Sequence, residues 1–220
     1  MSARDDIFAG MRRSLHVTGA EAPRRAAVEA RLRESPRGIV PARGQGGLET
    51  FCAEALRAAA TLTTVASADD VPAEVARYLR DSNLPATLRM GADPRLEAMP
   101  WGATTLDIAR GASDGHDLNA VSAAFAAIAE TGTLAMVSGP DNPTTLNMLP
   151  DNHIVVLFAK DVVGDFESVF DRLRRRYGKE IPRTLNFITG PSRSADIEQT
   201  LLFGAHGPRK LHIVLVAGGP

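Results

Sequence analysis

The stretch 185–208, which reads LNFITGPSRSADIEQTLLFGAHGP, decides the fold. Its first four residues, 185–188, are rich in β-forming side chains, and the turn pair Gly190-Pro191 soon follows. After Ser194, apolar residues recur at helical spacing on one face. The stretch therefore predicts a strand, a turn and a helix, which is a building unit of α/β proteins.

Polar residues gather in this stretch where the strand would end. In an open α/β sheet, ligands bind beyond the carboxyl ends of the strands, where helix N-termini present unpaired N–H groups. We therefore expect a site for an anionic group, with Arg193 as its cation. The predicted members are Gly190, Ser192, Arg193, Ser194, Asp196, Glu198 and His206. His206 has the chemistry to transfer protons near neutral pH, whereas Asp196 and Glu198 could equally serve only to offset the helix dipole.

From Leu48 onward the chain alternates helical and strand patterns. Helices are expected at 48–60, 71–80, 144–149 and 164–177, and strands at 61–66, 86–90, 104–108, 134–138, 153–159 and 211–217. The segment Asn119–Ala129 fits neither period well, and we expect a short strand followed by one helical turn. This alternation predicts an α/β fold with a mainly parallel sheet flanked by helices.

The N-terminal part differs from this pattern. Residues 2–15 predict an amphipathic helix with one apolar face, formed by Ile7, Phe8, Met11 and Leu15. Residues 19–47 are rich in Pro, Gly and Arg, which is typical of a flexible arm. The predicted domains are an N-terminal helix and arm, 1–46, and an α/β domain, 47–220. The helix could dock on its own domain or on a second subunit of a homo-oligomer.

Composition limits the partners and cofactors. Twenty-five Lys plus Arg against 26 Asp plus Glu give a net charge of -1, so no nucleic acid is expected as a partner. No apolar run approaches the ~20 residues of a membrane span and no signal segment is visible, so we expect a cytoplasmic protein. One cysteine, Cys52, cannot supply the four thiolates of an iron–sulfur cluster. Without nucleotide fingerprints or metal-ligand spacings, no cofactor or metal is expected in this chain.

A second polar segment, Glu130-Thr131-Gly132-Thr133, lies directly before a predicted strand. Glu130 has the chemistry of a general base or nucleophile, and the other three residues are candidate ligand contacts. The alternative is a turn in which Gly132 supplies an unusual backbone angle and the threonines begin the strand. A buried carboxylate needs a partner, so we expect Glu130 to be exposed in a cleft or paired, for instance with Arg193.

Four blocks of the chain resemble signature blocks of the lactate utilisation protein C (LutC/YkgG) family. They are 127–133, 149–154, 190–198 and 206–208. The resemblance implies a NagB/RpiA/CoA-transferase-like fold, an α/β sandwich with a mainly parallel sheet. It also implies membership of a three-protein cytoplasmic system that oxidises L-lactate to pyruvate, whose other two members are iron–sulfur proteins.

The leading hypothesis is a non-redox component of such a system that binds a small carboxylate or phosphate in a cleft between the two polar segments. Arg193 would make a bidentate contact, and Glu130 and His206 are the candidate catalytic groups. Two alternatives stay open. One is a free-standing enzyme like the CoA transferases, isomerases or cyclo-ligases of related folds. The other is a scaffold subunit for iron–sulfur partners that docks through the N-terminal helix.

Overall fold

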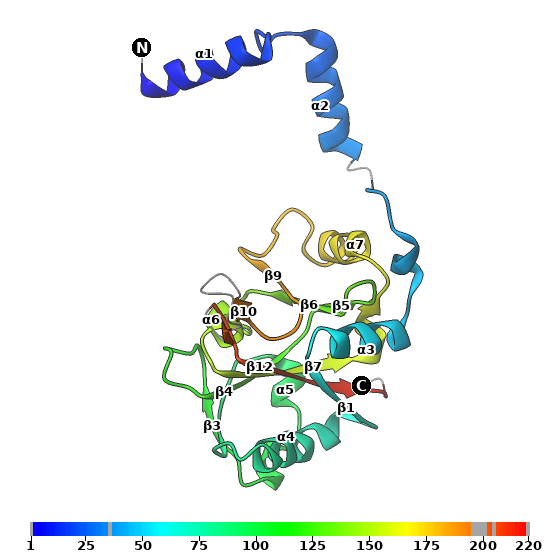
Figure 1. Cartoon of the computed structure of the whole chain (residues 1–220), viewed down its shortest axis with the longest axis vertical. Helices are drawn as coiled ribbons and strands as arrows, with labels where there is room; N and C mark the ends of the chain where they lie inside the picture. Colours follow the sequence, from blue (N-terminus) through cyan, green and yellow to red (C-terminus); the bar gives the residue numbers. More distant parts are fainter. Residues whose placement is uncertain (1, 35–36, 195–201, 204–205, 219–220) are drawn as a thin grey trace. The chain divides into compact units, whose positions relative to one another are not determined.

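Residues 2–34, 37–194, 202–203 and 206–218 are described by the computed structural model of this chain (Figure 1). The chain divides into two units, Met1–Ile39 and Val40–Pro220. The first unit consists of helices α1, Ala3–Leu15, and α2, Ala22–Glu34. Ser2 begins α1 with a capping box, in which its hydroxyl accepts the Asp5 N–H at 3.3 Å and the Asp5 carboxylate accepts the Ser2 N–H at 3.0 Å. The predicted N-terminal helix is therefore present.

The second unit begins at Val40, whereas the sequence placed the domain boundary after residue 46. The 3-10 turn η1, Ala42–Gln45, packs on the chain that enters helix α7, Phe166–Tyr177. A Cβ added to Gly164 would lie 1.9 Å from the Gly44 carbonyl oxygen, so only glycine permits this backbone approach. The structure thus assigns residues 40–46 to the α/β unit.

A six-stranded sheet forms the centre of this unit, in the order β1-β12-β7-β4-β2-β3. Every neighbouring pair is parallel. The strands are β1 Thr61–Val65, β2 Thr87–Met90, β3 Asp107–Arg110, β4 Asn119–Ala123, β7 Asn152–Phe158 and β12 Lys210–Val216. The last strand lies between two earlier ones, with His212 opposite Thr61 on β1 and Ile154 on β7. The predicted parallel sheet is confirmed.

A second, mixed sheet was not predicted. Its order is β8-β5-β6-β9, with β5 Ala126–Ile128, β6 Thr133–Val137, β8 Val162–Val163 and β9 Leu185–Ile188. Strand β6 is antiparallel to both β5 and β9. The helical turn predicted within 119–129 is wrong, because the chain passes from β4 through Ala124 and Phe125 into β5. Alanine favours helices locally, but the pairing of β5 with β6 and β8 overrides that preference.

Two short strands, β10 Arg193–Ser194 and β11 Leu202–Phe203, pair antiparallel. They lie at the ends of the segment predicted as a helix. Residues 195–201, the middle of that segment, lie outside the described residues. At the ends, the backbone of Ser194 pairs with that of Leu202, so these two positions form strands rather than a helix.

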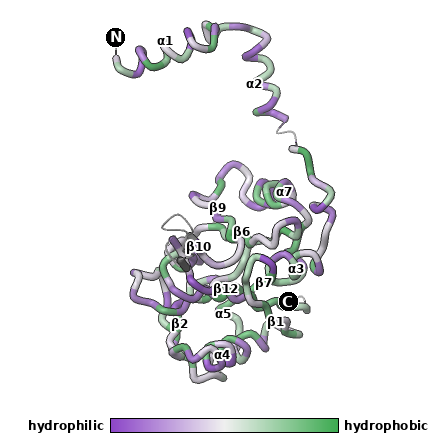
Figure 2. Tube along the Cα trace, viewed as in Figure 1, coloured by the Kyte–Doolittle hydropathy of each residue, from purple (hydrophilic) through white to green (hydrophobic). Residues whose placement is uncertain are grey.

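Helices and the second sheet cover the parallel sheet on its two faces (Figure 1). The helices of this unit are α3 Leu48–Arg57, α4 Val71–Asp81, α5 Pro94–Glu97, α6 Thr144–Met148 and α7 Phe166–Tyr177, with 3-10 turns η2 Ala68–Asp70, η3 Trp101–Ala103 and η4 Ala159–Asp161. Hydrophobic and hydrophilic residues alternate along α4 and α7 (Figure 2), as expected for helices that bury one face. The layers run from α4 through the two sheets to α7.

The core has three parts that follow these layers. Val75 and Leu79 of α4 pack on Ile154 and Val156 of β7. On the other face of β7, Val155 and Leu157 pack with Phe51 of α3 and with Leu134 and Met136 of β6.

The opposite face of β6 carries Ala135 and Val137, which pack with Val169 and Leu173 of α7. All seven residues of β7 are buried because both of its faces are covered.

Gly132 is a residue on which the contact between the layers depends. Its φ is +66°, and a Cβ there would lie 2.3 Å from the backbone nitrogen of Ala55 in α3. We expect Gly132→Ala to lower the free energy of unfolding by about 1–3 kcal/mol, because the turn must move away from α3 and the alanine is strained. Gly102→Ala is the matched control, since a Cβ there meets nothing within 4 Å. Equal urea midpoints for the two variants would contradict this prediction.

Candidate functional site

Antiparallel pairing of β6 with β9 brings the two polar segments together. Leu134 lies opposite Ile188, so Thr133 and Thr189 are neighbours at the same end of these strands. The Thr133 hydroxyl oxygen lies 2.6 Å from that of Thr189 and 2.6 Å from that of Thr131. We expected the two segments to meet at the rim of the parallel sheet, but β6 and β9 belong to the second sheet.

A cleft of about 420 Å³ lies beyond the end of β9. Its lining comes from residues 187–193, residues 206–208 and the end of α6 at Asn147 and Met148. Ser192 joins the two loops, because its N–H donates to the Pro208 carbonyl at 2.8 Å and its hydroxyl accepts the His206 N–H at 3.3 Å. The structure therefore brings together four of the predicted site residues: Gly190, Ser192, Arg193 and His206.

A buried polar group lies behind the cleft wall. The Ser122 hydroxyl donates to Asn147 Oδ1 at 3.2 Å, and Ser122 Oγ lies 2.6 Å from His153 Nε2. Ser122 thus lies between Asn147 and His153 in a buried chain of polar contacts. Among the described residues, Asn147 Nδ2 and His153 Nδ1 have no hydrogen-bond partner. Both atoms are buried, so they belong to the interior behind the cleft.

Glu130 lies outside this cleft. It is not among the described residues that line the cleft. Glu130 lies shortly after β5 in the chain, and its side chain is half-buried. Its N–H donates to the Gly164 carbonyl at 3.0 Å, and its Oε2 lies 3.7 Å from the position of a Cβ on Gly44. The carboxylate therefore lies beside η1, and the turn that contains Glu130 and Gly132 packs on α3 and η1.

Two further predicted residues, Thr131 and Thr133, are not among the described residues that line the cleft. Thr131 and Thr133 reach the cleft only through Thr189, and Thr133 is buried. Asp196 and Glu198 lie outside the described residues.

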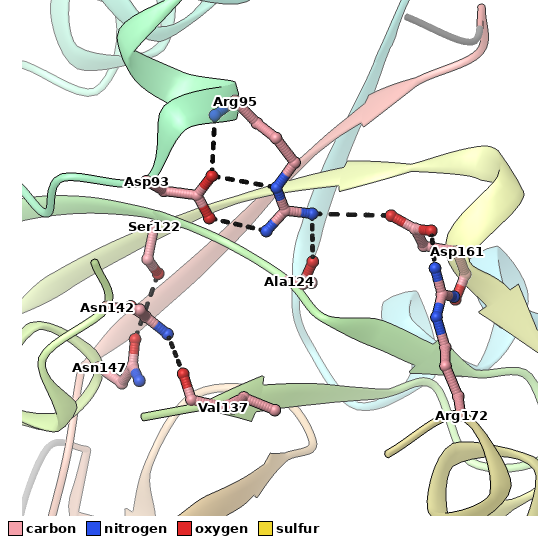
Figure 3. A network of polar contacts seen from close by, with 9 residues as sticks. All are labelled: Asp93, Arg95, Ser122, Ala124, Val137, Asn142, Asn147, Asp161 and Arg172. Atoms are coloured by element: carbon pink, nitrogen blue, oxygen red, sulfur yellow. Dashed lines mark hydrogen bonds and ion pairs between the residues drawn. The ribbon is translucent and has the colours of Figure 1, made fainter. Parts of the chain in front are cut away.

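A second polar cluster, which the sequence analysis missed, lies where the neighbouring parallel strands β2, β4 and β7 end (Figure 3). Arg95, just after β2, donates to both Asp93 carboxylate oxygens at 3.0 and 2.7 Å and to the Ala124 carbonyl at 3.0 Å. Asp161, after β7, lies 3.7 Å from Arg95 Nη1 and forms an ion pair with Arg172 of α7. The sequence does carry a signal for this cluster, because polar residues such as Asp93 and Asp161 come shortly after predicted strands.

Burial explains why these charges occur together. The side chain of Asp161 is 4% exposed and that of Asp93 is 11% exposed, so each carboxylate requires a cation. Burial lowers the pKa of Arg95. The hydrogen bonds and charge of Asp93, together with the charge of Asp161, raise it by a larger amount, so the pKa of Arg95 is above its usual value. The cluster is thus a fixed set of paired charges at the sheet edge.

Neither a metal centre nor a membrane span is found in the described part of the chain. No group of three His, Cys, Asp or Glu residues within that part could hold a metal ion. None of its helices combines the length and the apolar character needed to cross a bilayer.

Comparison with known proteins places the C-terminal part of the chain. Residues 119–216 match the family model described as the LUD domain. Lactate utilization protein C of Bacillus subtilis is 36% identical over 92 residues, which are 41% of this chain and 38% of that protein. Lactate utilization protein C of an Exiguobacterium species is 37% identical over 98 residues, 44% of this chain and 43% of that protein. The matched stretch thus spans about two fifths of the length of these curated relatives.

A solved structure supports the fold. The crystal structure of a DUF162 family protein from Deinococcus radiodurans superposes with a TM-score of 0.57 and covers 77% of this chain and 95% of that chain. The two sequences are 21% identical, so this likeness concerns the fold alone.

His153 should make the stability of the protein depend on pH. Burial lowers its pKa from 6.5 to about 3, so below about pH 6.5 the unfolded chain binds a proton that the folded protein excludes. The free energy of unfolding is expected to fall as the pH drops from about 6.5 toward 3. Burial also lowers the pKa of His212 to about 4, so His153→Gln should remove only about half of this pH dependence.

The measurement is urea unfolding of the wild type and the variant at several pH values between about 7 and 4. In this range His153 and His212 bind protons in the unfolded chain before they do so in the folded protein. His116→Gln is the control because His116 is exposed. An unchanged pH dependence in His153→Gln would contradict the prediction, because it would show that the folded and unfolded chains bind a proton at His153 equally well.

Proposed function

We propose, on the premise that residues 119–216 are a LUD domain of the lactate utilization protein C family, that this protein is a non-redox component of a cytoplasmic L-lactate oxidation system. In that role it binds a small carboxylate and does not itself transfer electrons. The matched region includes β6, β9 and both loops of the cleft beyond β9. The family relationship supports the lactate role, and the cleft supports ligand binding.

The convergence of residues 187–193 and 206–208 on one cleft carries this proposal. Arg193 brings a guanidinium group, whose planar fork of N–H donors matches a carboxylate. Asn147 Nδ2, a donor without a partner among the described residues, belongs to a residue of the same lining. The guanidinium group of Arg193 favours an anion, because a carboxylate matches both its charge and its N–H donors.

Within the cleft, roles can be assigned to two other side chains. Ser192 positions the 206–208 loop through its hydrogen bonds to His206 and Pro208. His206 is exposed at the rim, where its imidazole can exchange a proton with a ligand hydroxyl. Since Glu130 lies beside η1, we assign ligand contact to Arg193, Ser192 and His206 and not to Glu130.

The redox chemistry is proposed to reside in partner proteins. Oxidation of lactate to pyruvate releases two electrons, which need an acceptor. This chain has one cysteine, too few for a cluster bound by four thiolates. We therefore propose that the partners are iron–sulfur proteins of the same system and that this chain supplies the substrate site or completes the complex.

Arg193→Gln is expected to lower lactate-dependent dye reduction by the reconstituted three-protein system. Loss of one charge-assisted contact should raise the KM for L-lactate by roughly ten-fold or more. Arg209→Gln is the control, because Arg209 is a nearby exposed arginine that does not line the cleft among the described residues. Full activity of the two partners without this chain would contradict the proposal.

Assays of the chain alone test the enzyme alternative. The non-redox role predicts no turnover of lactate, CoA esters or sugar phosphates without partners, and an unchanged KM for lactate in Glu130→Gln within the complex. Turnover by the lone protein that Glu130→Gln abolishes would establish a free-standing enzyme instead.

A further inference from the structure

A cavity of about 110 Å³ lies beside the arginine cluster at the ends of β2 and β4. No described residue lines both this cavity and the cleft beyond β9. This volume suits one small ionic group. Its arginines come from α5 and α7, and the loop that follows β6 adds Ser138 and Asp141.

Several hydrogen-bond donors line its wall, which also contains the buried Asn142 Oδ1, an acceptor without a partner among the described residues. Three guanidinium groups reach it, from Arg95, Arg172 and Arg176. Ser138 adds a hydroxyl whose oxygen already accepts the Thr184 N–H at 2.9 Å, so its proton is available to another acceptor. The hydroxyl of Tyr177 is a further donor in the lining.

Two of the three carboxylates at or behind the cavity wall are paired with arginines. Asp93 lines the cavity but accepts from Arg95, and Asp161, which lies behind it, pairs with Arg172 and Arg95. The third carboxylate, Asp141, is exposed on the loop after β6. Paired arginines therefore present donors to the cavity without an unpaired buried acid to repel an anion.

Arg95 and Arg172 are held in place before any ligand arrives. Asp93 and Asp161 fix their guanidinium groups by hydrogen bonds and ion pairs (Figure 3). The Arg95 guanidinium carbon also lies 5.8 Å from the centre of the Phe158 ring, and that of Arg172 lies 5.4 Å from the Phe125 ring. A ligand would therefore lose little affinity to the ordering of these long side chains.

Arg176 is the lining arginine that no carboxylate holds in an ion pair among the described residues. Its guanidinium carbon lies 5.7 Å from the centre of the Tyr177 ring. It is exposed, in the last turn of α7, while its neighbour Arg175 on the same helix does not line the cavity. Arg176 thus brings to the cavity a guanidinium group that can turn toward a bound anion, while the exposed Asp141 brings a carboxylate on the loop after β6.

We propose that this cavity is a binding site for a single small oxyanion, a carboxylate or phosphate group, held by Arg95, Arg172 and Arg176. The proposal rests on the geometry of the arginine cluster and is independent of the lactate role. A cation is disfavoured because it would face three guanidinium groups, and a neutral apolar ligand would leave the donors unsatisfied.

The test is a titration of the full chain with sodium phosphate and, separately, sodium acetate, followed by calorimetry at constant ionic strength set with sodium chloride. Arg176→Gln is expected to weaken binding of the preferred anion by roughly ten-fold, since one charge-assisted contact is lost. Arg175→Gln removes the same charge from the same helix and should leave the affinity unchanged. Arg176→Lys, which keeps the charge but loses the planar fork, should lie between the wild type and Arg176→Gln.

Three outcomes decide the matter. Weakening confined to Arg176→Gln, with Arg193→Gln at the other cleft without effect, supports the site. Equal weakening in Arg175→Gln and Arg176→Gln overturns it, because the anion would then respond only to the overall charge of α7. No saturable binding of either anion up to about 10 mM, well above a Kd in the millimolar range, also overturns it.

Discussion

The parallel pairing of β12 with both β1 and β7 is the interaction on which the rest of the α/β unit depends. Strand β12 follows the other strands in sequence but lies between β1 and β7, so β1 joins the sheet through β12. The backbone groups of β7 are satisfied on both sides, by β12 and β4. Because β7 is buried throughout, each face of the sheet needs a cover, and α4 and the second sheet provide it.

Small side chains explain how two sheets pack on each other in so short a chain. The run from Ala123 to Ala129 contains five alanines, all of them buried. Ala127 and Ala129 face the parallel sheet, whereas Ala126 and Ile128 face α7. Strands alternate their side chains between two faces, so the small side chains on one face let the two sheets approach each other, while the other face packs on α7.

The two candidate sites use the two sheets differently. The cleft beyond β9 is formed by loops that the second sheet and the start of β12 hold together, and its polar groups are largely backbone, hydroxyl and imidazole groups. The cavity at the ends of β2 and β4 is formed by arginines that buried aspartates orient. In the second case the acids restrict the motion of the cations, so the site is ordered without a ligand.

The sequence by itself determined the elements whose causes are local. The apolar run 154–158 and the strand at Leu185–Ile188 were placed correctly, and α7 ends at Gly178, whose φ is +58°. It also brought Ser192, Arg193 and His206 into one candidate site, because they flank a recognisable strand and a Gly-rich loop. Only the tertiary structure decided that Ala126–Ile128 is a strand, that Glu130 faces η1 and that Arg95 meets Asp161. These outcomes depend on pairings between segments tens of residues apart, which compete with local preference and leave no periodic signal in either segment.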